Sequence, residues 1–88
     1  MRNYSDTVWV DLNEVHIPER TWERIMRKDR GQIANMQADF ESERDMVRVV
    51  LRTRFGGGYN VEDGRHRVIA AKLAGVSHIE AIIIGSID

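Results

Sequence analysis

Residues 59–75, the most informative part of the sequence, run Tyr-Asn-Val-Glu-Asp-Gly-Arg-His-Arg-Val-Ile-Ala-Ala-Lys-Leu-Ala-Gly. A short predicted strand, Tyr59–Glu62, leads through Asp63-Gly64 into a helix that opens with Arg65-His66-Arg67. The start of a helix exposes unpaired backbone N–H groups and the positive end of the helix dipole. Two arginines and a histidine at that point favour an anion site, and phosphate is the usual anion.

The segments on each side of this stretch are predicted to be strands. In Val47–Arg54, apolar and arginine side chains alternate, which predicts a half-buried strand. Gly56-Gly57-Gly58 lacks the spacing of a phosphate-binding P-loop and is predicted to turn that strand back as a hairpin. The helix should span Arg65–Ala74, and a last, largely buried strand is expected at Ile79–Ile84.

The first half of the chain predicts one strand and two helices. Val8–Leu12 is rich in β-branched and aromatic residues and predicts a strand. Thr21 is the expected N-cap of a helix that Gly31 ends, and a second helix should cover about Gly31–Glu43. Strands and helices in this order predict a small α/β (α+β) domain with about three helices. The expected core includes Val10, Phe40, Val49, Leu51, Ile69, Leu73, Ile82 and Ile84.

Composition limits the classes of function. The 88 residues predict a single domain, 1–88, without cysteine and therefore without disulfides or thiol chemistry. No apolar stretch is long enough to span a bilayer, and a cytoplasmic protein with no membrane partner is expected. The net charge of −1 gives no overall attraction to nucleic acid. Arginine nonetheless outnumbers lysine eleven to two, which suits phosphate contacts or equally reflects a compositional bias.

Asp63 provides an alternative to the anion site. An Asp before a helix commonly caps it by accepting hydrogen bonds from the next N–H groups, which would occupy the donors that phosphate needs. The two arginines would then simply screen Asp63 and Glu62. In the functional interpretation, Gly64 permits close backbone approach, and the N–H groups of residues 65–67 bind phosphate together with the Arg67 guanidinium.

Arg48, Arg52 and Arg54 are expected to form a basic row on one face of their strand. The row could contact nucleic acid or an acidic protein partner near the anion site. It could equally be a solvated strand face, or protect a sheet edge from pairing. The three histidines lack the spacing of metal ligands, so no metal site is predicted.

The opening stretch resembles the ParB/sulfiredoxin superfamily. ParB-like domains carry Gly-Glu-Arg-Arg before an alanine-rich helix ending in Leu-Ala-Gly, and sulfiredoxins carry Gly-Cys-His-Arg. Here Gly64-Arg65-His66-Arg67 is followed by Ala70-Ala71-Lys72-Leu73-Ala74-Gly75. The resemblance is good over residues 45–84 and extends over 8–44. It implies a compact mixed sheet covered by helices, with a nucleotide or nucleic-acid phosphate bound at Gly64, Arg65, His66 and Arg67.

The departures from the family limit what the resemblance implies. Arg65 stands where sulfiredoxins have their nucleophilic cysteine and ParB its glutamate, and a guanidinium cannot replace a thiol, so sulfiredoxin activity is excluded. The Gly-x-x-Gln-Pro segment of ParB is replaced by residues 42–46, Ser-Glu-Arg-Asp-Met. The ParB helix that holds the magnesium of a nucleotide, and the DNA-binding helix-turn-helix domain, would lie beyond Asp88. A full CTP-switching clamp is therefore not expected.

Two hypotheses follow. In the first, the chain is a small ParB-like domain that binds a nucleotide, with Mg²⁺, or a nucleic acid; a weak nuclease or NTPase activity would use Glu62 or Asp63. In the second, it is a non-catalytic module of a phage or plasmid that binds a host protein. The sequence contains no convincing acid–base constellation, which favours binding over catalysis and leaves enzyme activity open.

Overall fold

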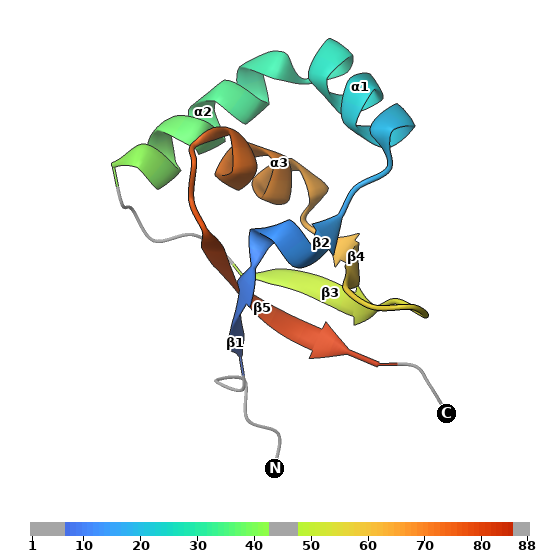
Figure 1. The fold of residues 1–88 in the computed structure, drawn as a ribbon. Helices are drawn as coiled ribbons and strands as arrows, with labels where there is room; N and C mark the ends of the chain where they lie inside the picture. Colours follow the sequence, from blue (N-terminus) through green and yellow to red (C-terminus); the bar gives the residue numbers. More distant parts are fainter. Residues whose placement is uncertain (1–6, 43–47, 86–88) are drawn as a thin grey trace.

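The computed structural model describes residues 7–42 and 48–85, and it confirms a small α/β domain with three α-helices (Figure 1). The predicted hairpin, its following helix and the last strand are all present in the expected order. In chain order the elements are β1 (Val8–Asp11), the 3₁₀ helix η1 (Leu12–Glu14), β2 (Val15–His16), α1 (Glu19–Lys28), α2 (Arg30–Glu41), β3 (Val49–Thr53), β4 (Tyr59–Asp63), α3 (Arg65–Leu73) and β5 (His78–Ile84).

The five strands form one mixed sheet in the order β1-β5-β3-β4-β2. The β1–β5 and β3–β4 pairs are antiparallel, whereas β3–β5 and β2–β4 are parallel. Consecutive strands β1 and β2 therefore lie at opposite edges of the sheet, although only η1 joins them.

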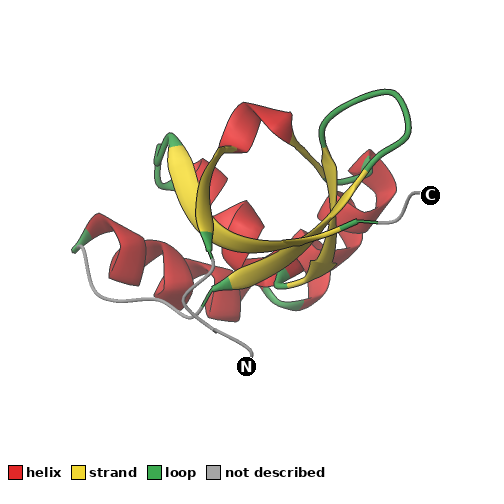
Figure 2. Cartoon of the chain, turned by 90° about the horizontal axis from the view of Figure 1, so that it is seen from below, coloured by secondary structure: helices red, strands yellow, loops and turns green. Residues whose placement is uncertain are grey.

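This connection forces the sheet to curl. In a flat sheet, four gaps of about 4.8 Å would place the edge strands about 19 Å apart. The four Cα–Cα steps from Asp11 to Val15 reach at most about 15 Å. Seen from below, the strands accordingly curve into a ring that η1 closes, with the helices behind it (Figure 2).

Helix α3 lies between two buried clusters. The sheet cluster contains strand residues such as Val49 and Leu51 together with Val68 and Ala71 of α3. The helix cluster contains Ile25 of α1, Ile33 of α2, and Ile69 and Ala70 of α3. Because its neighbours are the sheet on one side and α1 and α2 on the other, α3 buries four consecutive residues, Val68–Ala71.

This position of α3 corrects the predicted core. Val10, Val49, Leu51 and Ile69 are buried as expected, but Leu73 is 42% exposed and does not belong to the core. Ala70 and Ala71, which were not predicted to belong to the core, are buried in place of Leu73. Phe40 is partly buried against both clusters, and Ile82 and Ile84 are only half-buried because Ile79 and Ala81 of β5 face the core instead.

The helix boundaries in the first half also differ from the prediction. Helix α1 begins at Glu19 after Pro18, so Thr21 is not its N-cap. The break between α1 and α2 falls at Asp29, and Gly31 lies inside α2. Val47 and Glu43, predicted to belong to a strand and a helix, lie outside the described residues. None of the helices in the described ranges is long and apolar enough to cross a membrane.

Candidate functional site

A β-bulge leads the chain from β4 into α3. Along the β3–β4 pair, Leu51 lies opposite Val61 and Val50 lies opposite Asp63, which leaves Glu62 as an extra residue on β4. Bulges bend a strand and are common next to functional sites. Here the bulge directs the end of β4 towards the first residue of α3.

Gly64 joins the bulge to α3 and cannot readily be another residue. Its φ is +105°, in the left-handed region that glycine adopts at little cost. A Cβ at this position would lie 2.7 Å from Cγ1 of Val49, below any normal contact distance. The fold of β3 and β4 therefore requires this glycine even without a ligand, and the predicted role in phosphate approach is not needed to explain it.

The first turn of α3 has no side-chain cap. Its N-cap is Gly64, and the first helical hydrogen bond runs from the N–H of Val68 to the carbonyl of Gly64, at 3.0 Å. Asp63, the alternative that would have occupied this end, does not cap it. No side chain in the described part of the chain accepts a hydrogen bond from the N–H groups of residues 65–67, so these donors remain available to a ligand.

His66 ties this helix start to the junction of α1 and α2. Its Nε2 lies 2.9 Å from Oδ2 of Asp29, across 37 residues of sequence. Both side chains are partly exposed, at 31% and 42%. The contact fixes the imidazole, and His66 contributes to the candidate site through its backbone N–H and through holding α3 against Asp29. Nothing in the local sequence around Asp29 indicates this role.

Arg67 carries a buried donor without a partner. Its Nε is shielded from solvent and has no hydrogen-bond acceptor among the residues that the structure describes. Leaving such a group unpaired costs about 1–3 kcal/mol. Because Nε is shielded from a ligand as it is from water, only the rest of the guanidinium could contact an anion in the pocket that Arg67 lines.

These residues line one pocket of about 460 Å³ between α1, α2 and the start of α3. Three arginines contribute to it, Arg24, Arg65 and Arg67, against the two carboxylates of Asp29 and Asp63. Arg24 was not predicted from the sequence, since only the packing of α1 beside α3 brings it there. The full lining is Arg24, Ile25, Asp29, Gln32, Met36, Asp63, Gly64, Arg65, His66 and Arg67.

Glu62 does not line this pocket. Its carboxylate accepts a hydrogen bond from Nε of Arg52, at 3.0 Å. This hydrogen bond and the charge of Arg52 lower the pKa of Glu62, and the same contact raises the pKa of Arg52. Of the two weak catalytic candidates, the structure thus places Asp63 in the pocket and Glu62 in an ion pair beside it.

The predicted arginine row is divided by its partners. Besides the Arg52–Glu62 pair, Nε of Arg48 lies 3.9 Å from a carboxylate oxygen of Glu80. Arg54 lines a different pocket, near β2. The row therefore does not continue the charge of the candidate site as a set of unpaired cations. Within residues 7–42 and 48–85, no group of three acidic or histidine side chains is arranged to hold a metal ion.

This fold is similar to that of solved structures of ParB and sulfiredoxin, as the resemblance predicted. The chain superposes on the C-terminally truncated chromosome-partitioning protein ParB from Caulobacter crescentus, complexed with CTP-γ-S, with a TM-score of 0.73 and 14% identity. This match covers 93% of the chain and 46% of the ParB chain, so the protein spans about half of that chain's length.

Sulfiredoxin from Arabidopsis thaliana gives a TM-score of 0.70 at 19% identity, over 91% of this chain and 85% of that one. At these identities the likeness establishes the fold alone. No family profile matches the sequence, and comparison with curated proteins finds no match.

Proposed function

We propose that this domain binds the phosphate groups of a nucleotide at the start of α3. The observation that carries the proposal is the uncapped first turn of α3 beside the unpaired, buried Nε of Arg67. Backbone N–H groups at a helix start and a guanidinium are the two groups that proteins most often use for phosphate. The ParB structure with this fold is a complex with CTP-γ-S, which makes a nucleotide the first ligand to test.

In this proposal the N–H groups of residues 65–67 and the Arg67 guanidinium bind one phosphate. Arg65 and Arg24 line the same pocket and would neutralise further phosphates of a di- or triphosphate. The pocket volume of about 460 Å³ lies in the range of small-ligand sites.

Mg²⁺ would enter this site with the nucleotide. Magnesium in such sites is commonly held by one or two carboxylates together with the phosphates of the ligand. Asp63 lines the pocket, and no hydrogen bond or ion pair of its side chain is seen among the described residues. It is therefore the carboxylate best placed to contact a magnesium ion, whereas Asp29 already contacts His66. The ion would screen the repulsion between Asp63 and the phosphates.

The direct test is calorimetric titration with CTP, ATP and inorganic phosphate, each with and without Mg²⁺. Arg67→Met keeps most of the side-chain volume and removes the guanidinium, so it should weaken nucleotide binding by about 1.5–3 kcal/mol. Arg20→Met is the matched control, because Arg20 is exposed on α1 and does not line the pocket. If no nucleotide or phosphate binds at millimolar concentration, the helix start is a structural turn only.

A protein-binding module is the second candidate, and exposed aromatic side chains favour it. Trp9 of β1 is 68% exposed and Phe55 of the β3–β4 turn is fully exposed. Aromatic residues are enriched at protein interfaces. Trp9→Ala should weaken the binding of a partner that contacts Trp9 without any change in nucleotide affinity, which separates this function from the first.

A further inference from the structure

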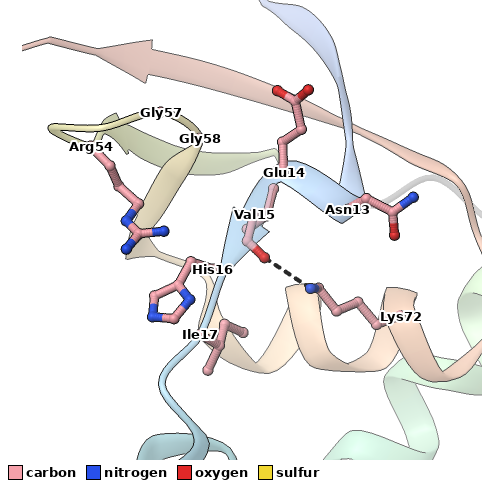
Figure 3. A pocket seen from close by; sticks show the side chains of 9 residues that line it. All are labelled: Asn13, Glu14, Val15, His16, Ile17, Arg54, Gly57, Gly58 and Lys72. Atoms are coloured by element: carbon pink, nitrogen blue, oxygen red, sulfur yellow. Dashed lines mark hydrogen bonds between the residues drawn. The ribbon is translucent and has the colours of Figure 1, made fainter.

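A second pocket lies at the other end of α3, in a part of the fold that the proposed nucleotide site does not use. It has a volume of about 770 Å³ and is bounded by η1, β2, the β3–β4 turn and the last turn of α3 (Figure 3). Its lining residues are Asn13, Glu14, Val15, His16, Ile17, Arg54, Gly57, Gly58 and Lys72.

Arg54 differs from the two other arginines of its strand. Arg48 and Arg52 face glutamates at 3.9 and 3.0 Å, whereas Arg54 makes no ion pair with any residue of the described ranges. Arg54 and His16 line the same pocket, and in Figure 3 the guanidinium and the imidazole point to the same side of β2. The carboxylate of Glu14, the acidic residue of this pocket, points away from them.

The backbone that carries these two side chains is fixed by hydrogen bonds and strand pairing. The N–H of Arg54 donates to the carbonyl of Gly58, and the N–H of Gly57 donates to the carbonyl of Arg54, both at 3.1 Å. His16 lies on β2, in register with Asn60 of β4. The backbone of both residues is thus held by paired strands and a closed turn, whereas their exposed side chains would be ordered by the ligand.

Two contacts fix the walls of the pocket. A Cβ on Gly58 would lie 2.9 Å from the carbonyl oxygen of Glu14, so the turn can pack this closely on η1 only with glycine there. On the opposite wall, Nζ of Lys72 donates to the carbonyl of Val15 at 2.8 Å. This bond joins α3 to β2 and leaves the charge of Lys72 without a counterion among the residues described.

We propose that this pocket binds an oxyanion, a phosphate or a carboxylate group, between the guanidinium of Arg54 and the imidazole of His16. A guanidinium offers two parallel N–H donors that match either group, and an imidazole adds a third donor. Arg54 and Lys72 outweigh the single carboxylate of Glu14, so the pocket attracts negative charge. This pocket and the proposed nucleotide site have no lining residue in common, so oxyanion binding here does not depend on nucleotide binding there.

The test is an NMR titration of the isotope-labelled full chain in the Arg67→Met background, which disables the proposed nucleotide site. Inorganic phosphate and acetate are added in separate experiments. Saturable shifts are expected at residues 14–17 and 54–58, including the side-chain Nε of Arg54. Binding of phosphate but not acetate identifies a phosphate-bearing ligand, whereas equal binding of both identifies a general oxyanion site that also accepts protein carboxylates.

Arg54→Gln should lower the affinity for phosphate about tenfold or more, the scale of one lost charge-assisted hydrogen bond. Arg48→Gln is the matched control, because it removes an exposed arginine of the same face that already pairs with Glu80, and it should leave the affinity unchanged. Arg54→Lys should fall between the two, since lysine keeps the charge but not the paired donors. Shifts that fail to saturate, or that survive Arg54→Gln, overturn the proposal.

Discussion

The two ends of α3 differ in how their backbone groups are satisfied. At the C-terminal end, Gly75 has a φ of +80°, its N–H donates to the carbonyl of Lys72, and the N–H of Val76 donates to that of Ala71. These two bonds form a Schellman motif, which closes the helix with the chain's own groups. At the N-terminal end, no described side chain accepts from residues 65–67, and the Nε of Arg67 is also unpaired. The C-terminal end is thus closed by the chain's own backbone, whereas the N-terminal end has no side-chain cap among the described residues and is the end at which we propose a ligand.

The largest difference in stability between the two ends is expected when the glycine at each end is replaced by alanine. Gly64→Ala should destabilise the protein by about 2–4 kcal/mol, because left-handed strain adds to a clash with Val49. Gly75→Ala has a similar φ but nothing within 4 Å of the new Cβ, so it should cost only about 1 kcal/mol. Urea unfolding of both variants measures the difference. Equal losses in the free energy of unfolding would mean that Val49 moves away from the new methyl group at little cost.

Arg67→Met should affect ligand binding and stability in opposite directions. Removing the unpaired buried Nε should raise the free energy of unfolding of the ligand-free protein by about 1–2 kcal/mol, because the cost of burying this donor without a hydrogen-bond partner disappears. The same variant should bind nucleotide more weakly, by about 1.5–3 kcal/mol. Thermal unfolding with and without nucleotide tests both parts; a less stable variant would show that Arg67 serves the fold instead.

Leu73→Ala tests the C-terminal end of α3. Although leucine in a core commonly costs 2–5 kcal/mol on truncation to alanine, Leu73 is 42% exposed, and its loss should cost less than about 1 kcal/mol. Ile69→Ala, in the same helix but fully buried, serves as the positive control. If chemical denaturation showed equal losses in the free energy of unfolding for the two variants, Leu73 would have to be part of the core.

The smallest effect concerns the ion pair beside the bulge. Because Arg52 lowers the pKa of Glu62 in the folded protein, the pair contributes stability above the ordinary pKa of glutamate, and that contribution is lost as the pH falls through the lowered value. Both side chains are exposed, so the effect should be slight. Glu62→Gln should flatten the pH dependence of the melting temperature in the acidic range without changing nucleotide affinity. A loss of nucleotide affinity in this variant would show that Glu62 contributes to the proposed nucleotide site.

Local patterns in the sequence were sufficient to predict the strands and the helix around Gly64, but not how the other helices pack against them. Alternation over β3, the glycine turn and the Gly64 helix start each act within a few residues, and the structure has them where they were predicted. The exposure of Leu73 could not be inferred, because it depends on α3 lying between the sheet and two other helices. The His66–Asp29 contact and the place of Arg24 in the pocket depend likewise on how α1 and α2 pack.

The division of the arginine row has the same origin. Alternation predicted that Arg48, Arg52 and Arg54 share a face, but their partners lie on neighbouring strands. Glu62 reaches Arg52 from an extra residue in a bulge, and no local signal in the sequence marks a bulge at that position. A row of charged residues on a strand can therefore be assigned to a ligand only when the register of the adjacent strands shows which of the charges are already paired.

The curled sheet has a consequence for how the chain acquires its structure during synthesis. β1 pairs with β5, and the side chains of Thr7 and Glu80, 73 residues apart, meet in a hydrogen bond of 2.6 Å. Of the five strands described, β1 is synthesised first and its partner β5 last, and contacts between such distant residues slow folding. Before β5 is synthesised, β1 and one edge of β3 have no partner strand and can pair with other chains.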